Sequence, residues 1–233
     1  MLLKRVYSKQ DQTSKIAEKE AGAPPTTEVT GLRARLIMKT TVTPEKAFEI
    51  IRKYNTEPFH LRHAVTVSQL MRFMAEDLSY SEDAEYWAAV GMLHDIDFEQ
   101  YPECHLDNTP EILKSEGISD DVIHAVCSHG YGICSDVEPE HEMEKVLFAC
   151  DELTGLVWAA AKMRPSRSCT DMELSSLKKK YKDKKFAAGC SREVISRGAE
   201  MLGWPLDDLL QRTLNAMKAT EEAVNSKCAE FES

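Results

Sequence analysis

Histidines and aspartates in the middle of the chain have the types and the spacing that bind a metal ion. Six of the seven histidines lie between residues 60 and 129. The doublet His94-Asp95 follows the apolar run 88–93, at the point where a predicted helix ends. Neighbouring residues of an ideal helix point about 100° apart, so both side chains reach one cation most easily at a helix end. The doublet therefore predicts a cation site.

Two further side chains could complete this site. His63 lies on the preceding predicted helix, and Asp151 lies within a long apolar helical stretch, residues 146–156. Burying a carboxylate without a partner is costly, and a metal ion is an effective partner. A solvated helix face or a buried ion pair explains Asp151 about equally well when this residue is taken alone.

The elements that must position these residues are predicted to be helices. Thr43 precedes Pro44, which is typical of a helix start, and Thr170 with Glu173 matches a capping box. Helical periodicity and caps recur with short breaks, and no segment has the alternation of a strand. The fold class is therefore all-α, a compact multi-helix bundle with extra C-terminal helices. The longest predicted helices cover about residues 60–78, 140–163 and 207 onward.

A lone histidine, a His-Asp doublet and a distant aspartate, in this order on a helical chain, resemble the HD superfamily of metal-dependent phosphohydrolases. The resemblance covers about residues 45–160 and includes the context of the doublet, residues 92–96. It implies four metal ligands, His63, His94, Asp95 and Asp151. It also implies hydrolysis of a phosphate mono- or diester, such as a nucleotide, through a metal-activated water.

Some members of that superfamily bind a second metal through extra histidines. The matching positions are His105 and His129, with Asp95 as the bridging carboxylate. The match is partial, because Leu106 follows the first extra histidine and Gly130 follows the second, where the two-metal pattern has a proline and another histidine. Imidazole and carboxylate ligands suit Mn, Fe, Ni, Co, Mg or Zn. We expect one or two divalent ions per chain.

Two acids beside the ligands are candidates for catalysis together with Asp95. Asp97 lies two residues after the doublet, and Glu152 follows the last ligand. Either carboxylate could move a proton or support a ligand. A surface position is the simpler explanation of each acid taken alone.

A basic stretch after the long helix could bind the substrate's phosphate. Arg164, Lys178 and Lys179 are its candidate residues, within a region that carries most of the clustered lysines of an acidic chain. A run of lysines is more often a solvated helix face. The expected substrate is a small phosphorylated molecule.

Composition and charge exclude several classes of partner. The chain has 29 Lys+Arg against 39 Asp+Glu, a net charge of -10, which disfavours nucleic acid and anionic membranes. No apolar run is long enough to span a bilayer. The seven cysteines form no C-x-x-C pair, which is typical of reduced thiols and predicts a cytoplasmic protein.

The chain is expected to hold one domain and a tail. Residues 1–40 are predicted to be a flexible tail, 41–165 the HD-type core, and 166–233 helices that pack on that core. Packing of the last helix on a second copy, giving a homo-oligomer, stays open. The three tryptophans lie in apolar helical contexts and are predicted core or interface residues: Trp87, Trp158 and Trp204.

Two other functions are compatible with these residues. The first is a di-iron oxygenase on the same scaffold, in which the extra histidines complete a redox-active pair. The second is a binding module without catalysis, which keeps the metal site and recognises a phosphorylated ligand or a protein.

Overall fold

The structure, a computed structural model, describes residues 42–232, and this part of the chain forms nine α-helices and one 3-10 turn. The all-α prediction is confirmed, since the only β-type contact in this range is an isolated bridge between Tyr131 and Ser135. The predicted tail, residues 1–40, lies outside the described residues. The helices are α1 (Pro44–Ile51), α2 (Pro58–Asp77), η1 (Ser81–Asp83), α3 (Ala84–Leu93), α4 (Thr109–Ser115), α5 (Asp120–Ser128), α6 (Glu142–Lys162), α7 (Leu174–Lys182), α8 (Arg192–Leu202) and α9 (Leu206–Cys228).

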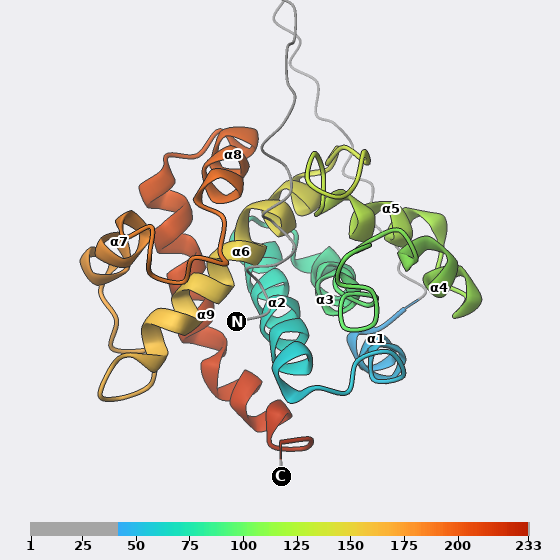
Figure 1. The fold of residues 1–233 in the computed structure, drawn as a ribbon, viewed down its shortest axis with the longest axis horizontal. Helices are drawn as coiled ribbons and strands as arrows, with labels where there is room; N and C mark the ends of the chain where they lie inside the picture. Colours follow the sequence, from blue (N-terminus) through green and yellow to red (C-terminus); the bar gives the residue numbers. More distant parts are fainter. Residues whose placement is uncertain (1–41, 233) are drawn as a thin grey trace, which may run out of the picture.

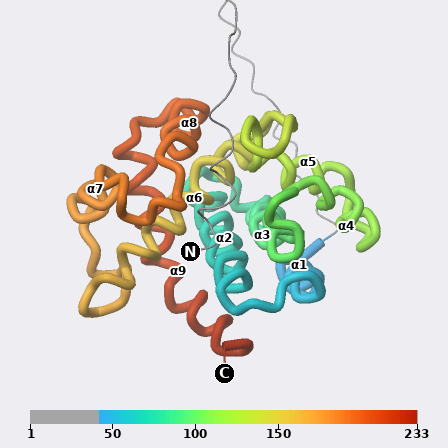
Figure 2. The backbone as a smooth tube through the Cα atoms, in the orientation of Figure 1, coloured from blue at the N-terminus to red at the C-terminus, as the bar shows by residue number. Residues whose placement is uncertain are grey.

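Helices α2 and α6 lie in the middle of the bundle (Figure 1). Helices α1, α3, α4 and α5 lie on one side of this pair, and α7, α8 and α9 lie on the other. Helix α2 packs against α3 and α9, and α6 packs against α8. The colours of Figure 2 show that the chain completes the first side before it builds the second. The two central helices therefore contact both sides.

Two glycines allow helices of the candidate site to pack closely against a neighbouring helix. A Cβ added at Gly91 of α3 would lie 2.9 Å from Met71 Cγ and 3.1 Å from the Val67 carbonyl oxygen on α2. A Cβ added at Gly198 of α8 would lie 2.5 Å from Ala149 Cα on α6. Because real side chains do not fit at such distances, glycine at these positions allows the backbones to approach. The end of α3 is thereby placed beside α2.

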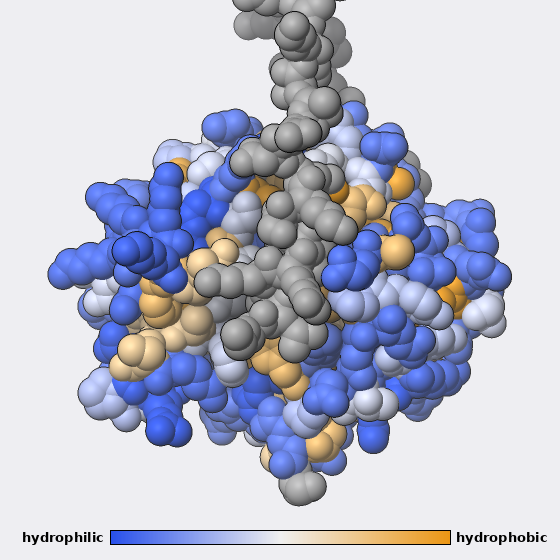
Figure 3. Space-filling model, in the orientation of Figure 1, coloured by the Kyte–Doolittle hydropathy of each residue, from blue (hydrophilic) through white to orange (hydrophobic). Residues whose placement is uncertain are grey.

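The apolar stripe of the last helix faces the inside of the chain. Leu209, Leu210 and Leu214 of α9 are buried, and this helix packs along α2 and α6. Hydrophilic residues cover most of the outer surface seen in Figure 3, and apolar residues reach it mainly nearer the centre. No helix of residues 42–232 is both long and apolar enough to cross a membrane. All seven cysteines are free thiols.

The helix starts are only partly as predicted. Thr43 caps α1, its hydroxyl oxygen accepting from the Lys46 backbone N–H at 3.2 Å. The capping box predicted at Thr170 is wrong, because α7 begins only at Leu174 and Glu173 is its N-cap residue. The Thr170 hydroxyl instead lies 2.7 Å from the Ser168 hydroxyl. That contact belongs to a turn before the helix.

Candidate metal centre

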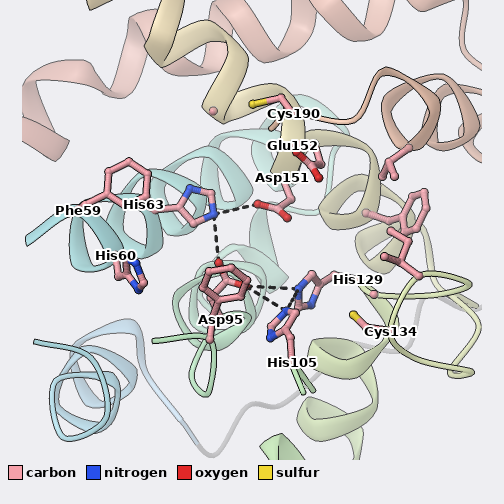
Figure 4. Close-up of a pocket in the computed structure, with 16 residues that line it drawn as sticks. Phe59, His60, His63, Asp95, His105, His129, Cys134, Asp151, Glu152 and Cys190 are labelled. Atoms are coloured by element: carbon pink, nitrogen blue, oxygen red, sulfur yellow. Dashed lines mark hydrogen bonds and ion pairs between the residues drawn. The ribbon is translucent and has the colours of Figure 1, made fainter. Parts of the chain in front are cut away.

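Three helices bring the first four predicted ligands together. His63 comes from α2, Asp151 from α6, and His94 and Asp95 directly follow the last residue of α3. His63 Nε2 lies 2.9 Å from Asp151 Oδ1, 3.1 Å from His94 Nε2 and 3.4 Å from Asp95 Oδ2. Figure 4 shows His63 and Asp151 directed toward each other, with Asp95 below them. These four side chains form the first ligand group.

A second ligand group lies on the other side of the same carboxylate. Asp95 Oδ1 lies 3.3 Å from His105 Nε2 and 3.5 Å from His129 Nε2, and the two imidazole nitrogens are 3.1 Å apart (Figure 4). His105 precedes α4, and His129 follows the last residue of α5. Asp95 therefore directs one oxygen toward each group, which is the arrangement of a bridging carboxylate.

The protonation of the imidazoles suits a cation. His94 Nδ1–H donates to the Gly91 carbonyl oxygen at 2.8 Å, and His129 Nδ1–H donates to the Val126 carbonyl oxygen at 2.6 Å. A neutral imidazole that donates from Nδ1 has a bare lone pair on Nε2. In both groups this Nε2 atom faces carboxylate oxygens and other imidazole nitrogens. A cation can bind several such lone pairs where they converge on one point. The residues present therefore fit a divalent metal ion in each group.

A family model of the HD domain matches residues 61–156. This part of the chain is an HD domain. All six candidate ligands of the two groups lie inside the matched range, and HD domains belong to a superfamily of metal-dependent phosphohydrolases. No match to the chain was found among curated proteins or among solved structures.

We call the two ligand groups together the HD centre, and burial and close opposite charges shift the pKa values of its residues. His94 is fully buried, which opposes its charged form, but Asp95 and Asp151 raise its pKa well above the usual value. Burial likewise opposes a charge on Asp151, yet His94 and His63 hold its pKa well below the usual range. The pKa of His105 is raised to about 9 by Asp95 and Asp97 against the effect of burial. In the absence of a metal, the raised pKa values of His94 and His105 mean that these imidazoles bind protons at the positions where a metal cation would bind.

Asp97 lies behind the second ligand group. It is fully buried, and its two oxygens accept from His105 Nδ1–H at 2.8 Å and from the Leu106 backbone N–H at 2.9 Å. These bonds fix the ring so that Nε2 points at Asp95. Support of this kind sets the tautomer and basicity of a metal ligand. Asp97 is thus placed to orient a ligand, one of the two roles predicted for it.

Glu152 lines the cavity of the HD centre beside Asp151 (Figure 4). One of its oxygens accepts from the Ser191 backbone N–H at 3.2 Å, which connects α6 to the start of α8. The walls of this cavity are otherwise mostly aromatic and aliphatic. Within residues 42–232, no Lys or Arg lines it; the lining residues are Phe59, His60, His63, Asp95, Phe98, His105, His129, Gly130, Ile133, Cys134, Phe148, Asp151, Glu152, Gly155, Cys190 and Val194.

The structure does not bring the predicted phosphate-binding residues to the HD centre. Arg164 Nε donates to Asp171 Oδ1 at 2.8 Å, and Lys178 Nζ donates to Asp207 Oδ2 at 2.6 Å. Neither residue, nor Lys179, lines this cavity. Arg164 and Lys178 thus bind acids of their own neighbourhood, outside the ligand groups.

Two residues beside His63 are among the cavity residues that sequence reasoning missed. His60 and Phe59 both line the cavity and lie on the first turns of α2. His60 precedes His63 by three residues, a spacing that places two side chains on one helix face. This spacing could have predicted that His60 lies on the same helix face as the candidate ligand His63.

Proposed function

We propose that this HD-domain protein is a metal-dependent phosphohydrolase that hydrolyses a phosphate mono- or diester, with nucleotides among the candidate substrates. The observation that supports this is the position of Asp95, with one oxygen beside His63 and the other beside His105 and His129. When bound there, divalent cations would lower the pKa of a water molecule and neutralise a phosphoryl oxygen.

The chain's own residues have distinct tasks in this proposal. Asp95 holds the two ligand groups at a fixed separation, and Asp97 holds the ring of His105. Phe98 and Phe148 line the cavity and reduce the water that reaches the phosphorus. Glu152 lies beside Asp151 at the same cavity and is the proposed proton acceptor for the attacking water.

Metal content and hydrolysis together test the proposal. Protein purified without chelator or polyhistidine tag is analysed for metal identity and stoichiometry, then assayed with 4-nitrophenyl phosphate and bis(4-nitrophenyl) phosphate. Asp95→Ala is expected to abolish hydrolysis and to lower metal content while helicity is retained. Asp107→Asn removes an exposed acid from the same loop and should leave both unchanged. Full activity in Asp95→Ala would refute the proposal.

A di-iron oxygenase is the second candidate. The observation that favours it is the absence of Lys and Arg among the described residues that line the metal cavity, since a phosphate would gain from such a partner. The test is oxygen consumption by the iron-loaded protein with a phosphonate or a polyol. A single redox-inert metal in the active protein would exclude this candidate.

The remaining parts of the proposal concern location and partners. We propose a cytoplasmic location, which the seven free cysteines support. A small phosphorylated molecule is the proposed partner, and neither nucleic acid nor a membrane is expected. Stabilisation of the protein by phosphate esters without turnover, with each of several metals, would instead indicate a binding module.

A further inference from the structure

A second pocket adjoins the cavity of the HD centre. It has a volume of about 480 Å³ and lies between α2, α6 and the connection from α7 to α8. We call it the side pocket. Its lining residues are Phe59, Arg62, His63, Thr66, Thr154, Gly155, Trp158, Ala159, Ala187, Ala188, Gly189 and Cys190. This volume is within the range of pockets that bind small molecules.

The side pocket shares part of its lining with the cavity of the candidate metal ligands. Four residues line both cavities: Phe59, His63, Gly155 and Cys190. A Cβ added at Gly155 would lie 3.0 Å from Cys190 Sγ, so α6 and residue 190 lie close together where the two cavities meet. The two cavities are therefore adjacent at His63, so a molecule held at this residue lies at the edge of the side pocket.

The charge of the side pocket is balanced within the protein. Among the described residues that line it, Arg62 is the one with a formal charge. Arg62 donates from Nε and Nη2 to the two carboxylate oxygens of Glu232, both at 2.7 Å, and from Nη1 to Asn225 Oδ1 at 2.9 Å. Lys162 and Arg167 line a smaller neighbouring cavity and not this one. An anionic group in the side pocket would find no uncommitted cation among its lining residues.

The other walls are neutral and small or aromatic. The hydroxyls of Thr66 and Thr154 donate to backbone carbonyl oxygens of their own helices, at 2.8 Å and 2.7 Å. Phe59 and Trp158 lie edge to face with ring centroids 5.9 Å apart. Trp158, predicted as a core or interface residue, is half-buried at this pocket. Such walls favour an apolar or aromatic guest over a polar one.

The wall formed by residues 187–190 has a backbone that hydrogen bonds hold in place. Ala187, Ala188 and Gly189 belong to a loop whose carbonyl oxygens surround the guanidinium of Arg192. Four carbonyl oxygens of this loop accept from it, those of Asp183, Phe186, Ala187 and Cys190, and so do two at the end of α7, those of Lys180 and Tyr181. The pocket is therefore largely formed before any ligand arrives, which lowers the entropy cost of binding.

We propose that the side pocket binds the uncharged, apolar or aromatic body of a molecule whose single phosphoryl group lies at the HD centre. This inference rests on the proposed function and narrows its substrate class to esters with one phosphate and a neutral body. Esters with a second anionic group at the far end of the body are selected against.

Two phosphonates that cannot be hydrolysed test the side pocket by binding alone. Isothermal titration of the Mn²⁺-loaded protein compares methylphosphonate with benzylphosphonate, which differ only in the apolar body. The Kd of benzylphosphonate is expected to be at least tenfold lower. A third ligand, 4-(phosphonomethyl)benzoate, adds a carboxylate to the ring and is expected to bind at least tenfold more weakly than benzylphosphonate.

Two variants locate the preference in the side pocket. Ala159→Leu fills the pocket from α6 and should reduce the benzyl preference to less than threefold, with the Kd of methylphosphonate unchanged. Trp158→Ala removes an aromatic wall and should weaken only benzylphosphonate. Ala219→Leu makes the same exchange at an exposed position of α9 and should keep the preference. Far-UV circular dichroism and metal content confirm that each variant is folded and loaded.

The outcomes separate this inference from the proposed function. Equal binding of the two phosphonates, a preference that survives Ala159→Leu, or tight binding of the carboxylated ligand would overturn the neutral side pocket alone. The expected preference without hydrolysis of any phosphate ester would keep the side pocket and overturn the hydrolase. No binding of either phosphonate would overturn both.

Discussion

Removing the charge of Asp97 tests whether the HD centre has two separable metal sites. In Asp97→Asn a neutral amide replaces the carboxylate that accepts from His105 Nδ1–H at 2.8 Å and from the Leu106 backbone N–H at 2.9 Å. The amide has one oxygen for these two donors, so the Leu106 N–H loses its acceptor when this oxygen stays at His105. Neither change touches His63 or Asp151. The second ligand group should therefore weaken while the first keeps its affinity.

The size of the effect follows from these two bonds. Removing a supporting partner of a metal-binding histidine typically lowers metal affinity by about 10- to 100-fold, or roughly 1.4 to 2.7 kcal/mol. A buried donor left without an acceptor, here the Leu106 N–H, lowers the free energy of unfolding by about 1–3 kcal/mol. We expect both effects in the same variant.

Titration of chelator-treated protein with Mn²⁺ measures the two affinities, and thermal unfolding measures the stability. Wild-type protein is expected to bind two ions, and Asp97→Asn one ion with unchanged affinity and one much more weakly. Asp107→Asn, which removes a charge from an exposed position of the same loop, is the matched control. The reasoning is refuted if both ions weaken equally in Asp97→Asn, or if neither does.

Three further predictions concern pH, packing and the basic stretch. In metal-free protein the pKa of folded His105 is about 9, above its ordinary 6.5, so protonation of His105 stabilises the fold fully below about pH 6.5 and this stabilisation is lost as the pH rises through 9. Thermal unfolding in chelator should show the free energy of unfolding fall over this pH range, and His105→Gln should make the fall smaller. Gly198→Ala would place a Cβ 2.5 Å from Ala149 Cα and should lower the free energy of unfolding by about 1–3 kcal/mol in urea titrations. Arg164→Gln and Lys178→Gln break exposed ion pairs, so each should cost under about 1 kcal/mol and leave KM for a phosphate ester within about twofold; a large rise in KM would place the basic stretch at the substrate.

The proximity of the candidate ligands was predictable from the sequence because chain order and residue type carry the signal. His94 and Asp95 were predicted at the end of a helix, and α3 does end at Leu93. Helix N-caps that depend on the conformation of the preceding turn were harder to predict from the sequence. The Thr170 hydroxyl had the right type and spacing for a capping box, but its contact with Ser168 in the folded chain could not be deduced from local sequence.

The side pocket was not predicted, because its walls come from segments that are far apart in the chain. One signal was present on α6, where Asp151, Gly155, Trp158 and Ala159 recur at the spacing of a single helix face. Small and aromatic side chains on the same helix face as the candidate ligand Asp151 indicate the wall of a pocket rather than the hydrophobic core. What they face, residues 187–190, depends on the tertiary contact of α6 with α8, which helical periodicity does not encode.

The way Arg192 holds its loop has a consequence for how this chain can diversify. Its guanidinium contacts carbonyl oxygens, which every residue type has, and no side chain of residues 183–190 takes part in these bonds. Substitutions at Ala187 or Ala188 therefore change the surface of the side pocket without removing what fixes the path of the loop. Ligand preference can change here by single substitutions while the metal ligands, on other elements, stay constant.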